Sequence, residues 1–138
     1  MTIRAVFDTN ILISALLSVT GPPFRCLALA REGFVESVTC VPILDEFADK
    51  LRTKFGFAED RVRKAVDEVQ RISTVVTILR RLSVVKDDPD DDVIVECALQ
   101  GDATYIVTGD KHLIGLGQYA GVRIIRAAQF VDLVPPPA

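Results

Sequence analysis

Short β-branched and aromatic runs alternate with longer segments of helical period along the 138-residue chain. The runs predict strands at residues 3–7, 35–40, 105–107 and 122–125, with a further candidate at 75–79. Apolar residues at helical spacing predict helices at 11–17, 24–31, 42–51, 58–72, 92–100 and 127–133. This alternation favours an α/β fold, a three-layer α/β/α sandwich with a mostly parallel central sheet.

The length suits a single domain over residues 1–134, followed by a proline-rich tail at 135–138. The N-terminal apolar run is too short for a signal peptide and no run approaches a membrane span, so we expect a cytoplasmic protein. Cys26, Cys40 and Cys97 are sparse and odd in number, which predicts buried thiols rather than disulfides or a zinc site.

Charge is distributed unevenly along the chain, although its sum is only −3. Nine Lys and Arg against four acids between residues 50 and 81 leave an excess of five positive charges. An acidic cluster follows at once, formed by Asp87, Asp88, Asp90, Asp91 and Asp92 around Pro89. A basic segment beside concentrated carboxylates suits an enzyme that holds polyanions and metal ions together.

Four places on the predicted fold offer carboxylates to one edge of the sheet. Asp8 ends the first strand, and Asp110 follows the strand at 105–107. Either Asp91 or Asp92 begins a helix that is apolar nearly all round, and Glu46 borders the apolar stripe of the helix at 42–51, whereas Asp49 lies opposite that stripe. Each aspartate could equally cap a helix, so the grouping, rather than any single residue, indicates a site.

The motifs Asp8-Thr9-Asn10, Glu46, Asp88-Pro89-Asp90-Asp91 and Thr108-Gly109-Asp110-Lys111 resemble those of PIN domains. The likeness spans residues 3–133 and is greatest to toxin components of toxin–antitoxin systems. It implies an endoribonuclease that uses Mg²⁺ or Mn²⁺, a homodimer and an antitoxin protein as partner.

By this resemblance the catalytic and metal-binding acids are Asp8, Glu46, Asp91 and Asp110. Counting back seven positions from Ala98, a small residue of the buried helix, selects Asp91 as the third acid. Position 92 is Asp where similar proteins often have Asn, so Asp92 stays an alternative to Asp91 as the ligand. Position 112 is His where an acid is common, and we interpret His112 as a surface residue. The supporting residues are Thr9, Asn10, Asp92 and Thr108.

The predicted helix at 58–72 carries cations outside its apolar stripe, and two interpretations of them stay open. They either guide the RNA backbone or form a solvated surface paired with neighbouring acids. The cations proposed to bind RNA are Arg61, Arg63 and Lys64.

Three rival functions share some of these features. A phosphatase that forms a phospho-aspartate requires a second Asp two residues after Asp8, where this chain has Asn10. A receiver domain requires paired acids near Asp8 and a phosphoacceptor at a middle strand, and neither is found. A PIN-like protein that binds RNA or protein without cleavage remains the main alternative.

Overall fold

The computed structural model describes residues 2–79 and 89–134. Within them, six strands form one sheet in the order β3-β2-β1-β4-β6-β5, in which only β5 is antiparallel to its neighbour. The strands are β1 (Ile3–Phe7), β2 (Val35–Cys40), β3 (Ser73–Val76), β4 (Tyr105–Val107), β5 (Gln118–Tyr119) and β6 (Val122–Ile125).

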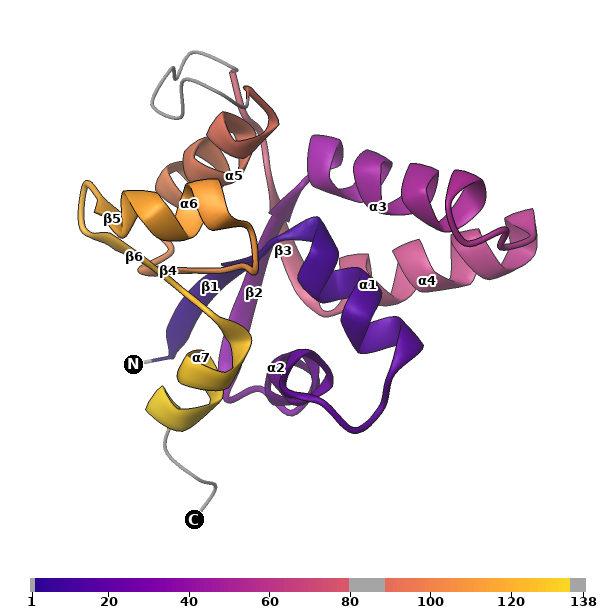
Figure 1. The fold of residues 1–138 in the computed structure, drawn as a ribbon, viewed down its shortest axis with the longest axis horizontal. Coiled ribbons are helices and arrows are strands. Elements are labelled where there is room, and N and C mark those ends of the chain that lie inside the picture. Colours follow the sequence, from indigo (N-terminus) through magenta and orange to yellow (C-terminus); the bar gives the residue numbers. More distant parts are fainter. Residues whose placement is uncertain (1, 80–88, 135–138) are drawn as a thin grey trace.

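Helices cover both faces of this sheet, so the predicted three-layer α/β/α fold is confirmed (Figure 1). On one face, α5 packs against β1, β2 and β4, and α6 packs against β6. On the other face, α1 contacts α2 and α3, α2 contacts α7, and α4 extends alongside α3. The helices are α1 (Thr9–Leu17), α2 (Pro22–Arg31), α3 (Val41–Thr53), α4 (Glu59–Arg71), α5 (Pro89–Gln100), α6 (Lys111–Leu116) and α7 (Ala127–Leu133).

The strand order reverses between β1 and β4. From β1 the chain proceeds outward through β2 and β3, then crosses by α5 to β4 on the other side of β1. In a parallel sheet such a reversal leaves a crevice at the carboxyl ends of the two strands, because the following helices pack on opposite faces. The residues that follow β1 and β4 therefore border this crevice.

The core is continuous beneath the crevice. Phe7 of β1 and Tyr105 of β4 both meet the ring of Phe130 edge to face, with ring centroids 5.8 and 5.7 Å apart. Gly101, directly after α5, lies so close to Val38 of β2 that an added Cβ would collide with that side chain. This close approach holds the end of α5 against the sheet.

The three cysteines are buried, as the sequence predicts. Burial raises the pKa of Cys26 to about 12. A hydrogen bond with Cys40, together with burial, raises the pKa of Cys97. All three thiols therefore belong to the core and offer no nucleophile to the crevice.

Several predicted boundaries are wrong. The strand expected at 75–79 is β3 at Ser73–Val76, because its ladder with β2 begins at the pair Ser37 and Ser73. Helix α5 begins at Pro89 rather than residue 92, since proline is well suited to a first helical turn. Strand β5 was not predicted, and the expected tail at 135–138 lies outside the described residues.

No single helix in the described part of the chain is long and apolar enough to span a membrane. Helices α1 and α2 reach that length and apolarity only together, as a pair bent by 97°.

Candidate active site

A pocket of about 260 Å³ lies where β1 and β4 end. Asp8 follows β1 directly, and its backbone N–H donates to the carbonyl of Val107, the last residue of β4, at 3.0 Å. The two strand ends are therefore joined at the bottom of the pocket. Its lining residues are Asp8, Asn10, Glu46, Asp49, Lys50, Asp91, Ile94 and Asp110.

The Asp8 carboxylate is buried, with 7% of the residue exposed, and is held by two short hydrogen bonds. Its Oδ1 accepts from the N–H of Thr9 at 2.7 Å, and its Oδ2 accepts from the hydroxyl of Thr108 at 2.6 Å. The Thr108 hydroxyl in turn accepts from the N–H of Asp110 at 3.0 Å. A chain of hydrogen bonds thus couples Asp8 to Asp110 through a fully buried threonine.

Burial is the main reason why the pKa of Asp8 lies above its ordinary value of 3.8. The negative charges of Glu46 and Asp110 raise this pKa further, whereas the hydrogen bonds from Thr108 and Thr9 oppose the rise. The fold therefore places a desolvated carboxylate next to two others, at a cost that a cation would relieve.

Asp110 caps α6 as well as lining the pocket. Its Oδ1 accepts from the N–H groups of His112 at 2.8 Å and Leu113 at 3.2 Å. Its capping role and its place in the pocket are therefore compatible, because the cap fixes the direction of the carboxylate. His112 itself is exposed on α6 and does not line the pocket, which agrees with its interpretation as a surface residue.

Helix α3 brings three charged residues to the pocket, two more than predicted. Glu46 Oε1 lies 3.1 Å from the ammonium of Lys50, one helical turn later. Exposed Asp49 also lines the pocket although it lies opposite the apolar stripe. The prediction for Asp49 failed because the spacing of residues on a helix does not reveal how closely a neighbouring helix, here α5, approaches its outer face.

Helix α5 contributes Asp91 and Ile94. Asp91 is 6% exposed and lines the pocket, whereas Asp92, one residue later, is half-buried and does not. Asp87 and Asp88 of the acidic cluster lie outside the described residues, as does the side chain of Asp90.

The predicted supporting residues are divided around the pocket. Asn10 is exposed and lines the pocket, whereas Thr108 is buried and does not line it. Thr9 is fully buried, and within the described residues its hydroxyl has no hydrogen-bond partner. Thr9 therefore contributes through its backbone N–H, which binds Asp8.

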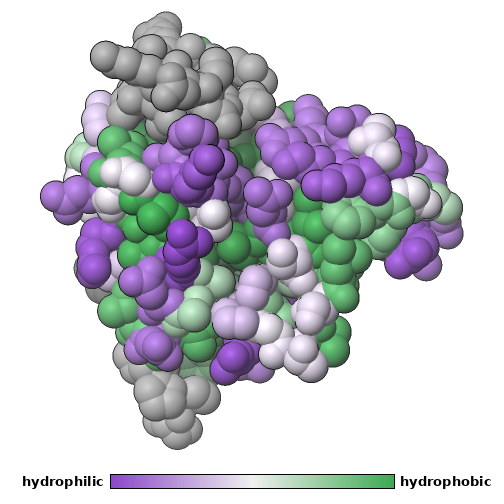
Figure 2. Space-filling model, viewed as in Figure 1, coloured by the Kyte–Doolittle hydropathy of each residue, from purple (hydrophilic) through white to green (hydrophobic). Residues whose placement is uncertain are grey.

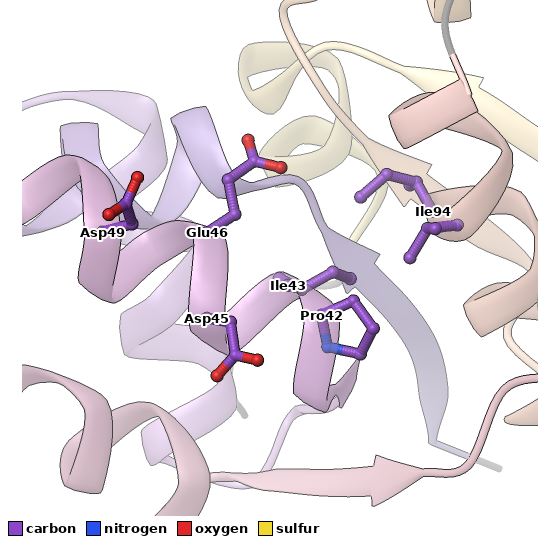
Figure 3. Close-up of a pocket in the computed structure, with 7 residues that line it drawn as sticks. Pro42, Ile43, Asp45, Glu46, Asp49 and Ile94 are labelled. Carbon is purple, nitrogen blue, oxygen red and sulfur yellow. The ribbon is translucent and has the colours of Figure 1, made fainter.

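A second hollow of about 330 Å³ adjoins the first between α3 and α5. It shares Glu46, Asp49 and Ile94 with the first pocket and is completed by Pro42, Ile43, Asp45 and Val93. In Figure 3, Glu46 extends from α3 toward the space in front of Ile94, while Asp45 points the other way. Glu46 thus stands on the border of the two hollows.

The oxygen-rich donor set suits a hard divalent cation such as Mg²⁺ or Mn²⁺. Carboxylates Asp8, Glu46, Asp91 and Asp110 come from four different elements, and the pKa of Asp8 already reflects the charge of two of the others. Among the residues that the structure describes, no three acidic, His or Cys side chains are already gathered as a metal cage. Binding an ion therefore requires movement of side chains such as Glu46, which is now paired with Lys50.

The cations of α4 lie outside the pocket. Arg61, Arg63 and Lys64 are exposed near the beginning of α4, at the outer end of the α3 and α4 pair (Figure 1). Arg61 lies over the ring of Phe57, 4.0 Å from its centroid. None of the three takes part in an ion pair with another described residue, and Arg80 and Arg81 lie outside the described residues.

Two of the four acids expected to pair with the cations of the predicted helix at 58–72 form ion pairs, and one of these pairs, Glu68 with Arg71, lies within that helix as expected. Glu59 binds Arg52 at 2.8 Å, and Glu68 joins Arg31 of α2 to Arg71 at 3.0 and 2.6 Å. In the space-filling view, hydrophilic residues cover much of α3 (Figure 2). The surface on the α3 side of the pocket is therefore strongly polar.

Three comparisons relate this chain to known proteins. Residues 4–112 match the sequence model of a family described as the PIN domain. The chain is 34% identical over 119 residues to the uncharacterized protein MJ1680 of Methanocaldococcus jannaschii, which covers 83% of this chain and 75% of that protein. The crystal structure of PAE2754 from Pyrobaculum aerophilum superposes with a TM-score of 0.66 over 96% of this chain and 89% of that one, and at 12% identity this likeness concerns the fold.

Proposed function

This chain belongs to the PIN-domain family, whose members are typically nucleases that use divalent metal ions, and we propose that it is a metal-dependent endoribonuclease acting at the pocket between β1 and β4. One observation carries the proposal. The fold gathers Asp8, Glu46, Asp91 and Asp110 from four separate elements around one pocket, although their charges repel. Such clustering is costly without a cation, and it suits a metal-dependent site.

The proposed roles of the acids follow from how each is held. Asp8 is the central ligand, because its two oxygens are fixed by Thr108 and the N–H of Thr9. Asp91 and Asp110 complete the ligand set, and Glu46 binds a second ion or orients water. When bound, a Mg²⁺ or Mn²⁺ ion supplies Lewis acidity, which makes an attacking water more acidic and neutralises charge on the phosphate oxygens.

The finer points of function remain proposals. We propose RNA as the substrate, with Arg61, Arg63 and Lys64 as its binding residues, and a cytoplasmic location. The resemblance to toxin components implies in addition a toxin role, an antitoxin protein as partner and a homodimer. The exposed positions of the three cations and their lack of described ion pairs are compatible with contact to a polyanion.

The experiment is cleavage of single-stranded and looped RNA by purified protein with Mn²⁺ or Mg²⁺. We expect cleavage to stop with a chelator and with Asp8→Ala, Asp91→Ala or Asp110→Ala, and to weaken with Glu46→Ala. Wild-type cleavage by Asp8→Ala would refute the assignment, because the signal would then come from a contaminant or another site.

Two further outcomes distinguish the rivals. Intact RNA that nevertheless binds tightly in the presence of metal would support the binding module without cleavage. Stable binding of beryllofluoride would instead support a phospho-aspartate domain, because a nuclease should ignore this phosphate analogue.

A further inference from the structure

One lysine stands among the carboxylates of the pocket. Of the described residues that line it, Lys50 is the single cation beside Asp8, Glu46, Asp49, Asp91 and Asp110. Its ammonium contacts Glu46 Oε1 at 3.1 Å, and the two side chains are 34% and 36% exposed. Lys50 is therefore neither locked in the core nor free in solvent.

Glu46 is held in a different way from Asp8 and Asp110. Asp8 and Asp110 are held by backbone N–H groups, and Asp8 also by the hydroxyl of Thr108. Glu46, in contrast, is held within the described contacts only by the end of a long, flexible side chain. A divalent ion that takes Glu46 competes with the ammonium for the same oxygen and can displace it.

A side-chain cation at this place would favour substrate binding in addition to any bound metal ion. A phosphodiester is anionic, and in the pocket it would face five carboxylates, of which Asp8 and its neighbours already repel one another. The cations Arg61, Arg63 and Lys64 do not line the pocket and so cannot supply this contact there. An ordinary helix pair four residues apart would stabilise the fold only slightly, which leaves the position of Lys50 unexplained by stability.

Resting on the nuclease function proposed above, we propose that Lys50 is a phosphate-binding residue of the pocket. In the metal-free protein its ammonium pairs with Glu46. When a divalent ion takes the Glu46 carboxylate, the ammonium is released and binds a phosphate of the RNA. Lys50 thus opposes metal binding by the free protein and favours RNA binding by the metal-loaded one.

The first test measures metal binding without RNA. Lys50→Met keeps an unbranched side chain but removes the charge, so Mn²⁺ should bind about twofold more tightly in calorimetric titration, the value of one partly exposed helix ion pair four residues apart. Lys54→Met is the matched control, since Lys54 is exposed at the end of the same helix and does not line the pocket. We expect the control to bind Mn²⁺ as the wild type does.

The second test measures binding of a labelled single-stranded RNA by anisotropy over several salt concentrations. Ca²⁺ replaces Mn²⁺, and the RNA is checked to be intact afterwards. With Ca²⁺, Lys50→Met should bind RNA more weakly and with a salt slope smaller by about 0.7, the contribution of one phosphate contact. With chelator instead, the slopes of wild type and variant should agree, because Lys50 then remains on Glu46. Lys50→Arg should retain most of the metal-dependent slope.

The failures are distinguishable. If the wild type binds Mn²⁺ and cuts RNA but Lys50→Met shows unchanged metal affinity and salt slope, Lys50 is a structural helix pair and the inference is overturned while the nuclease function stands. If Mn²⁺ affinity rises but the salt slope stays the same, Lys50 only repels the metal and the phosphate contact is refuted. A wild type that neither binds Mn²⁺ nor cuts RNA overturns the proposed function and this inference together.

Discussion

Replacing Thr108 by Val should remove the hydrogen bonds that couple Asp8 to Asp110 while leaving the packing almost unchanged. The Thr108 hydroxyl donates to Asp8 Oδ2 at 2.6 Å and accepts from the N–H of Asp110 at 3.0 Å. Thr108 is fully buried, so water cannot replace either bond. Valine has nearly the same shape but neither donates nor accepts.

The size of the effect follows from these two bonds. A hydrogen bond to a charged group contributes about 1.5–3 kcal/mol, and one between neutral groups about 0.5–1.5 kcal/mol. Thr108→Val should therefore lower the free energy of unfolding by about 2–4.5 kcal/mol when Asp8 is ionised. A domain of this size is commonly stable by about 5–15 kcal/mol, so the variant should still fold.

The loss should depend on pH, because the Thr108 bond favours the ionised form of Asp8. In the folded protein the pKa of Asp8 is raised above 3.8, so the native state loses stability as pH rises from 3.8 through that pKa. Without the Thr108 hydroxyl the pKa of Asp8 should rise further. The loss caused by Thr108→Val should therefore be smaller below pH 3.8 and complete above the pKa of Asp8 in the folded variant.

Urea unfolding of the metal-free protein in a chelator, at one acidic and one neutral pH, measures this difference. Thr39→Val is the matched control, since Thr39 is 2% exposed in β2 and its hydroxyl has no partner among the described residues. That control should leave stability unchanged or raise it, because it removes an unsatisfied buried hydroxyl. Equal losses for the two variants, or no dependence on pH for Thr108→Val, would refute the argument.

Three further predictions concern charge. Asp8→Asn should stabilise the metal-free protein at neutral pH and remove most of the increase in melting temperature caused by Mn²⁺, as measured by calorimetry with and without the ion. Asp91→Asn should abolish RNA cleavage while Asp92→Asn preserves much of it, because only Asp91 lines the pocket; the reverse result in a cleavage assay would move the site by one residue. Neutralising Arg61, Arg63 and Lys64 of α4 together should lower the salt slope of RNA binding by about 2 and leave metal-induced stabilisation unchanged. An unaltered slope would show that these cations form a solvated surface.

The sequence predicts the parts of the site that depend on the sheet. Asp8 and Asp110 follow strands, and parallel strands end at one edge, so their approach to each other could be expected before the structure was known. The hydrogen bond from Thr108 to Asp8 could not, because it requires β1 and β4 to be direct neighbours. Strand order depends on contacts between residues about 100 positions apart, and the local pattern of a sequence does not encode them.

The helices explain why Asp49 and Lys50 were missed. The helical period of α3 correctly predicts its buried stripe, formed by Ile43, Leu44, Phe47 and Leu51. The period gives only the direction in which each side chain leaves the helix axis, and it does not give the position of neighbouring elements. Which of the remaining faces borders a pocket depends on where α5 lies, and α5 is placed by the crossover from β3 and by its contact at Gly101 with β2. Lys50 lies one turn after Glu46, so any fold that brings Glu46 to the acids also brings this cation to them. A lysine one turn from a suspected ligand is therefore a signal that sequence reasoning can use, because it marks an acid that already has a cationic partner on its own helix.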